Sequence, residues 1–86
     1  MRIHINYTGR SYQIAESLPD EITLADGADL DDALQAVRGL LPDGEELPLS
    51  CLVSLAGKHR GTVASHSGGQ LSDGDELVLI APVAGG

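Results

Sequence analysis

The sequence predicts a small α+β fold in which a mixed sheet packs on one main helix. Several segments alternate apolar and polar residues with the period of a strand, and one segment has the period of a helix. A chain of 86 residues has room for one hydrophobic core. The apolar stripe of a single helix and the apolar face of a sheet must therefore cover each other, which gives an α+β roll. The pattern alone leaves the pairing of the strands open.

Two strands are predicted before the helix. In RIHINY the apolar Ile3 and Ile5 alternate with polar residues, which is typical of a half-buried strand. DEITLADG repeats this alternation with Ile22 and Leu24 and then ends in a glycine turn. The stretch between them, residues 8–17, has no clear period.

The segment ADLDDALQAVRGLL changes to the period of a helix. Its apolar residues form one stripe, made of Leu30, Leu34, Val37 and Leu41. Asp29 is the predicted N-cap, because its carboxylate can accept from free amide hydrogens at the helix start. Pro42, followed by Asp43 and Gly44, ends the helix.

The second half of the chain predicts further strands. LPDGEELPLS is a turn-rich connection, and CLVSLAG reads as a buried strand. KHRGTVASHSGGQLS predicts a hairpin and an irregular loop in which Val63 and Leu71 contact the core. A tight turn at residues 73–75 then leads into a last strand, from Glu76 to Ala81.

Composition excludes several classes of function. The net charge is −8, so phosphate backbones and anionic membranes would repel the chain, and a natural partner would be basic. Phe and Trp are absent, which leaves only Tyr7 and Tyr12 to stack on bases. We therefore expect neither a nucleic-acid partner nor a membrane partner. Acidity that merely keeps the protein soluble is an equally good reading of the charge.

One cysteine and the absence of a leader indicate the compartment. Cys51 is the single cysteine, so the chain forms no internal disulfide, which suits a reducing environment. The start of the chain has no signal-peptide pattern, and the longest apolar run is far shorter than the roughly 20 residues of a membrane span. The expected location is the cytoplasm.

The residues that usually carry catalysis form no convincing constellation. His4, His59 and His66 lack metal-ligand spacing, and we expect each to be a surface residue rather than a ligand. Cys51 is expected to be a buried, inert thiol. The basic stretch 58–60 is expected at a solvated hairpin tip. The glycine-rich GGQLSDGD lacks the ending of a P-loop. The sequence predicts neither a metal site nor a catalytic site.

The C-terminal tail is the candidate functional segment. Gly85 and Gly86 have no Cβ, so they fit a channel too narrow for side chains. Pro82 removes a ladder donor and favours the end of the strand. The Gly86 carboxylate is inert until it is joined to AMP, after which a sulfur or nitrogen nucleophile can displace the AMP. We predict a domain at residues 1–82 and a flexible Gly-Gly tail at residues 83–86.

The motif LSDGDELVLIAPVAGG resembles the C-terminal signature of the ubiquitin-like sulfur carriers, most of all the small subunits of molybdopterin synthase. That signature is a turn such as Asp-Gly-Asp-Glu, an apolar strand, and Pro-Pro-Val-Ala/Ser-Gly-Gly. GADLDDALQAV and CLVSLAG are similar to the family's helix start and third strand. Ala81 departs from the pattern, because the family often has a proline there, and the segments TGRSYQIAES and 58–69 match little.

The resemblance implies a β-grasp fold and a sulfur carrier that is no enzyme itself. An ATP-dependent adenylyltransferase of the ubiquitin-activating type would adenylate Gly86, and a persulfide sulfurtransferase would convert it to a thiocarboxylate. The large subunit of molybdopterin synthase would then receive the tail and pass the sulfur to a pterin precursor during molybdenum cofactor biosynthesis. The implied insertion residues are Pro82, Val83, Ala84 and Gly85. No bound cofactor is implied, since ATP belongs to the activating enzyme.

Three alternatives stay open. A sulfur carrier of the thiamine pathway shares the fold and the Gly-Gly end, although its tail usually lacks the Pro-Val-Ala approach. A ubiquitin-like modifier would join Gly86 to lysines of target proteins, but Lys58 is the single lysine here and offers few sites for chain building. A structural or regulatory β-grasp domain would carry the tail without using it.

Overall fold

The computed structural model of the chain describes residues 1–9 and 12–81. In this part of the chain the secondary structure follows the order β1 (Arg2–Thr8), α1 (Tyr12–Ser17), β2 (Glu21–Thr23), α2 (Leu30–Gly39), β3 (Leu52–Leu55), β4 (Lys58–Thr62) and β5 (Glu76–Ile80). The terminal residues Pro82–Gly86, which include the predicted tail, lie outside the described residues.

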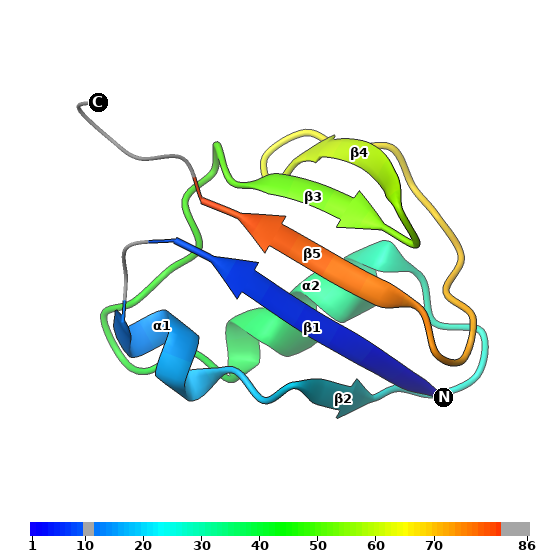
Figure 1. The fold of residues 1–86 in the computed structure, drawn as a ribbon, viewed down its shortest axis with the longest axis horizontal. Coiled ribbons are helices and arrows are strands. Elements are labelled where there is room, and N and C mark those ends of the chain that lie inside the picture. The colour runs from blue at the N-terminus through cyan, green and yellow to red at the C-terminus, as the bar shows by residue number, and fades with distance from the viewer. Residues whose placement is uncertain (10–11, 82–86) are drawn as a thin grey trace.

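The strands form one mixed sheet in the order β2-β1-β5-β3-β4. Strands β1 and β5 pair in parallel, whereas the other three pairs of neighbouring strands are antiparallel. Helix α2 crosses one face of this sheet (Figure 1). The α+β prediction is confirmed, and a five-stranded mixed sheet with one main helix is compatible with a β-grasp fold. The topology also supplies the strand pairing, which the sequence pattern left open.

The core lies between the inner face of the sheet and α2. Alternate residues of the strands point inward because successive side chains of a strand face opposite sides. The buried strand residues are Ile3, Ile5, Ile22, Val53, Leu55, Leu77 and Leu79. The helix contributes Leu30, Ala33, Leu34 and Val37. Val63 and Leu71 are also buried, as the sequence predicts for the loop after the hairpin.

The start of α2 has the predicted cap. The Asp29 side chain accepts from the Asp32 amide at 3.0 Å, and the Asp32 side chain accepts from the Asp29 amide at 3.0 Å. This reciprocal capping box satisfies two of the amide groups that a helix start leaves without partners. Asp31 and Asp32 lie in the first turn, where the helix dipole favours negative charge. The helix ends at Gly39, before Pro42.

The structure adds elements and shifts some boundaries. The segment without a clear period contains the short helix α1, whose Ile14 is buried in the core. Leu24 lies just after β2 and is partly buried, and Cys51 precedes β3 instead of opening it. The last strand ends at Ile80 rather than Ala81. Six residues are too few for α1 to show a helical period in sequence.

Candidate functional site

The predicted site residues all lie outside the described residues; they are Gly86, Pro82, Val83, Ala84 and Gly85. The structure does describe the segment that precedes them, which we name the base of the tail. This base is the end of β5. Its last ladder partners are Thr8 of β1 and Leu52 of β3, both paired with Ile80. Ala81 still donates its amide to the Thr8 carbonyl at 2.8 Å. The chain is therefore held by the sheet up to Ala81.

Gly9 packs closely against the same base. A Cβ at Gly9 would lie 2.9 Å from the Cβ of Ala81 and would overlap the hydroxyl of Tyr7. Real side-chain carbons do not approach this closely, so glycine at this position lets the chain after β1 lie against Ala81. The sequence analysis did not identify Gly9, and an isolated glycine after a strand carries no signal of such a contact.

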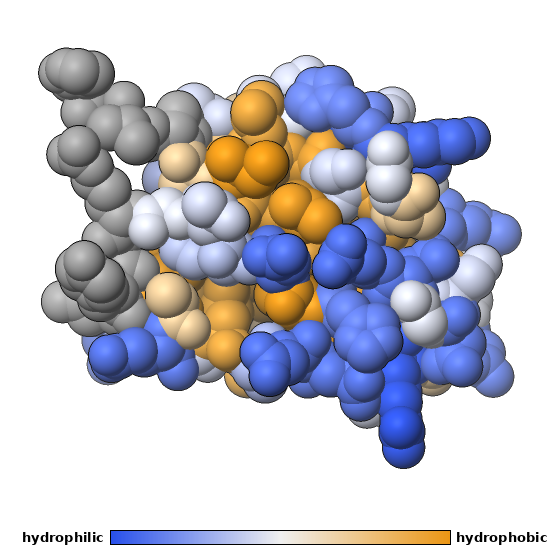
Figure 2. Space-filling view, in the orientation of Figure 1, coloured by the Kyte–Doolittle hydropathy of each residue, from blue (hydrophilic) through white to orange (hydrophobic). Residues whose placement is uncertain are grey.

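An apolar patch lies on the outer face of the sheet beside this base. We define it as Leu52, Val78 and Ile80, which share one face because Leu52 pairs with Ile80 and Val78 stands two residues before Ile80. Leu52 is 39% exposed and Ile80 is 41% exposed. Figure 2 shows apolar surface over β3 and β5, with polar side chains around it. Adjacent exposed apolar side chains make this patch a candidate contact surface for another protein.

Cys51 directly precedes Leu52 in the chain and is fully buried. Burial raises the pKa of the Cys51 thiol, so it is protonated and unreactive at neutral pH. Burial also raises the pKa of Tyr7, and the negative charges of the Cys51 thiolate, which forms only at alkaline pH, and of Glu45 add to the effect because they disfavour a phenolate. The predicted burial of Cys51 is confirmed, and the raised pKa of its thiol agrees with the expectation of an inert residue.

The histidines divide into two classes. His4 and His59 are exposed, as predicted. His66 is only partly at the surface, because its side chain is 13% exposed and lies between α2 and the end of β4. The described residues contain no group of three His, Cys, Asp or Glu side chains placed to hold a metal ion.

The basic stretch after the hairpin turn is only partly solvated. Lys58 and His59 are exposed, whereas Arg60 is half-buried. The Arg60 Nη1 atom donates to the Gly68 carbonyl at 3.4 Å. The prediction of a solvated hairpin tip is therefore correct for the first two residues, and the third covers the loop that follows β4.

A hollow of about 610 Å³ lies at the end of α2 and along the connection that follows it. Its charged lining residues are Arg38, Asp43, Glu45 and Glu46. The hollow is open to solvent and contains no side chain arranged as a nucleophile with a base.

Among the described helices none is long and apolar enough to cross a membrane.

Comparison with known proteins identifies a relative over the full chain. No family model matches the sequence, and no solved structure matches it. The chain is 28% identical over 86 residues to the molybdopterin synthase sulfur carrier subunit of Chlamydomonas reinhardtii, and the match covers 100% of both proteins. The size, the mixed sheet with one main helix and the C-terminal motif agree with this match. The chain is therefore similar over its whole length to that sulfur carrier subunit, which agrees with the resemblance of its C-terminal motif.

Proposed function

We propose that this protein is the sulfur carrier subunit of a molybdopterin synthase and that it carries sulfur on the terminal carbonyl of Gly86. The full-length match to a curated sulfur carrier subunit is the observation on which this proposal rests. The strand that precedes the tail supports it. Because β5 is paired on both sides, the tail continues from a fixed point at the end of the sheet.

The proposed chemistry takes place in other proteins' active sites. A carboxylate oxygen of Gly86 attacks the α-phosphorus of ATP and releases pyrophosphate, which leaves an acyl adenylate. A persulfide sulfur then attacks the acyl carbon and displaces AMP. A second thiol of the sulfur donor breaks the resulting S–S bond, forms a disulfide with the donor and leaves the thiocarboxylate on Gly86. In this proposal the chain supplies the C-terminal carboxylate, which is the nucleophile of the first step and the acyl group of the second, and the partner proteins supply the catalytic acids and bases.

Three partners follow from this chemistry: an adenylyltransferase, a persulfide sulfurtransferase and the large subunit of the synthase. The apolar patch is the proposed contact for the large subunit. It lies at the end of β5, so a partner that covers Leu52 and Ile80 would also receive residues 82–86. Pro82, Val83, Ala84 and Gly85 would fill the entrance to its active site.

A charge in the apolar patch should weaken binding of the large subunit. We expect Ile80→Lys to raise the Kd at least about tenfold, because a cation in a desolvated apolar contact costs roughly 1.4 kcal/mol or more. Leu40→Lys is the matched control, since Leu40 is 43% exposed but lies at the end of α2, away from the patch. Calorimetric titration of the large subunit would measure both. If Ile80→Lys and Leu40→Lys bind the large subunit with equal affinity, the patch is not part of the interface.

Intact-mass spectrometry tests the proposed function directly. The protein is incubated with ATP, an adenylyltransferase of this family and a persulfide donor. We expect a mass gain equal to the replacement of one oxygen by sulfur, followed by loss of that gain when the large subunit and a pterin precursor are added. The enzymes are first shown to load their own carrier. If they then fail to load this chain, or if Gly86 is found joined to lysines of other proteins, the proposal is wrong.

A further inference from the structure

The outer edge of β4 is covered by the residues that follow it. An edge strand exposes backbone amides and carbonyls that can pair with another chain. Here residues 65–68, which we name the strap, fold back along β4 after a tight turn. The Thr62 amide donates to the Ser65 carbonyl at 2.8 Å, and the Ser67 amide donates to the Arg60 carbonyl at 2.9 Å. The outward-facing backbone groups at this end of β4 are thus satisfied within the chain.

Gly61 permits the close approach of the strap. It forms an isolated antiparallel bridge with His66, and its φ of 126° lies in a region that residues with side chains rarely adopt. A Cβ at Gly61 would overlap the Ser65 carbonyl oxygen and would lie 2.9 Å from the Cα of His66. The glycine therefore fits a strap that lies directly against the strand.

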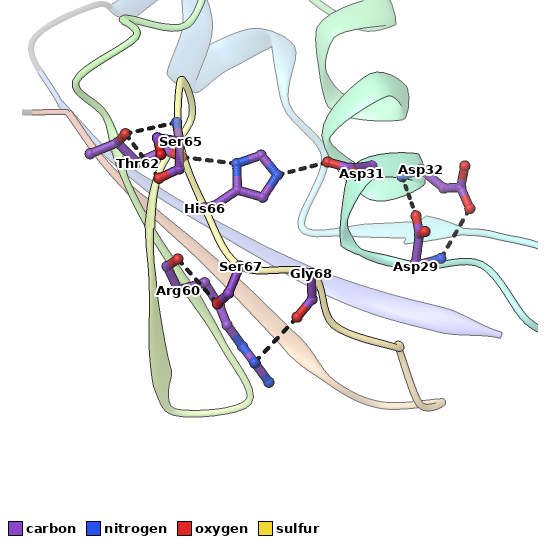
Figure 3. A network of polar contacts seen from close by, with 9 residues as sticks. All are labelled: Asp29, Asp31, Asp32, Arg60, Thr62, Ser65, His66, Ser67 and Gly68. Atoms are coloured by element: carbon purple, nitrogen blue, oxygen red, sulfur yellow. Dashed lines mark hydrogen bonds and ion pairs between the residues drawn. The ribbon is translucent and has the colours of Figure 1, made fainter.

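His66 joins the strap to both β4 and α2. Its Nδ1 atom lies 2.9 Å from the Thr62 carbonyl oxygen, and its Nε2 atom lies 2.7 Å from the Asp31 Oδ1 atom (Figure 3). A carbonyl and a carboxylate can only accept hydrogen bonds, so each ring nitrogen must carry a proton to form its bond. Both contacts are made together only by the imidazolium form.

We propose that residues 65–68 act as a pH-dependent strap, in which the His66 imidazolium bridges Thr62 and Asp31 and keeps the edge of β4 closed. Deprotonation removes one of the two donors and leaves a ring lone pair facing an acceptor oxygen. The bridge then loses one hydrogen bond and its ionic character. The strap opens more often, and the amides of Thr62 and Ser67 exchange with solvent.

The charged groups around His66 support a strap that opens when His66 loses its proton. From α2, the Asp31 carboxylate faces the ring, while the neighbouring Asp29 and Asp32 carboxylates bond to each other's backbone amides in the helix cap. From β4, the Arg60 guanidinium bonds to the Gly68 carbonyl. The Asp31 hydrogen bond raises the pKa of His66 above its usual 6.5, against the opposing effect of burial. The His66 bridge therefore stabilises the closed strap fully below about pH 6.5, and this stabilisation is lost as the pH rises through the raised pKa of His66.

Nuclear magnetic resonance of the full chain tests the proposal between pH 5.5 and 9. The ring nitrogens of His66 should titrate together with the exchange protection of the Thr62 and Ser67 amides, after correction for intrinsic exchange. We expect this protection to fall about three- to tenfold across the titration. The Val63 amide, which donates to the Cys51 carbonyl, should keep its protection and serves as the internal control. Strap protection that is independent of His66 ionisation would overturn the proposal.

Two variants test whether the His66 bridge itself, rather than a general loss of structure, controls the exchange protection of the strap amides. His66→Ala and Asp31→Asn should each lower the protection of the two strap amides at pH 6 and abolish its pH dependence. His59→Ala and Asp43→Asn are the matched controls, because these side chains are exposed and take no part in the bridge of His66 to Thr62 and Asp31. Unchanged strap protection in either of the first two variants would contradict the role of the bridge. Circular dichroism confirms that all four variants are folded.

Discussion

Deletion of Gly86 is expected to abolish sulfur loading while the fold stays intact. The shortened chain still ends in a glycine carboxylate, but that carboxylate is one residue, about 3.3–3.6 Å, short of its place beside ATP. Misplacement of a reacting group by as little as about 1 Å can lower a rate about 100-fold. We therefore expect the rate of thiocarboxylate formation, followed by intact mass, to fall by at least that factor.

The stability of the deletion variant should equal that of the full chain. The described core ends at β5, and glycine has no side chain to bury. Urea unfolding should therefore give the same midpoint for both proteins. Ala84→Gly is the matched control for loading, because it changes the tail's side chains but not its length. Normal loading of the deletion variant would exclude Gly86 as the carrier, and a lower unfolding midpoint would show that the end of the tail packs on the fold.

The elements that could be predicted from the sequence are those whose signal is local. The alternation around Ile3 and Ile5 depends only on which face of a strand is buried, and Asp29 caps a helix that begins at the next residue. These features need no knowledge of distant contacts. The parallel pairing of β1 with β5 is different, because it joins the two ends of the chain and has no marker in either strand.

The same distinction applies to the candidate site. The tail could be proposed from its chemistry, since two terminal glycines suit activation as an acyl adenylate in a narrow channel. His66 could not be placed, because its bridge joins residues that are 35 positions apart. The apolar patch also depends on the fold, since Leu52 and Ile80 become neighbours only when β3 pairs with β5. A sequence pattern gives the face of each strand but not the strand beside it.

Leu79→Ala should destabilise the protein more than any change on the outer face of the sheet. Leu79 is fully buried in the central strand and pairs with Tyr7 on one side and Val53 on the other. Truncation of such a leucine removes its transfer free energy and leaves a cavity, at a cost of about 2–5 kcal/mol. Small domains have a total stability of about 5–15 kcal/mol, so much of the stability would be lost. Urea unfolding followed by circular dichroism would measure the difference.

Ile80→Ala is the control that separates folding from function in the same strand. Ile80 follows Leu79 directly but faces outward and is 41% exposed, so its truncation should lower the free energy of unfolding by less than about 1 kcal/mol. It should nevertheless weaken binding of the large subunit, whereas Leu79→Ala at a temperature where it remains folded should not. If both variants unfold alike, the outer face of β5 contributes to the core and the apolar patch is not a free docking surface. If they differ as expected, alternation along one strand divides its side chains between the core and the proposed partner.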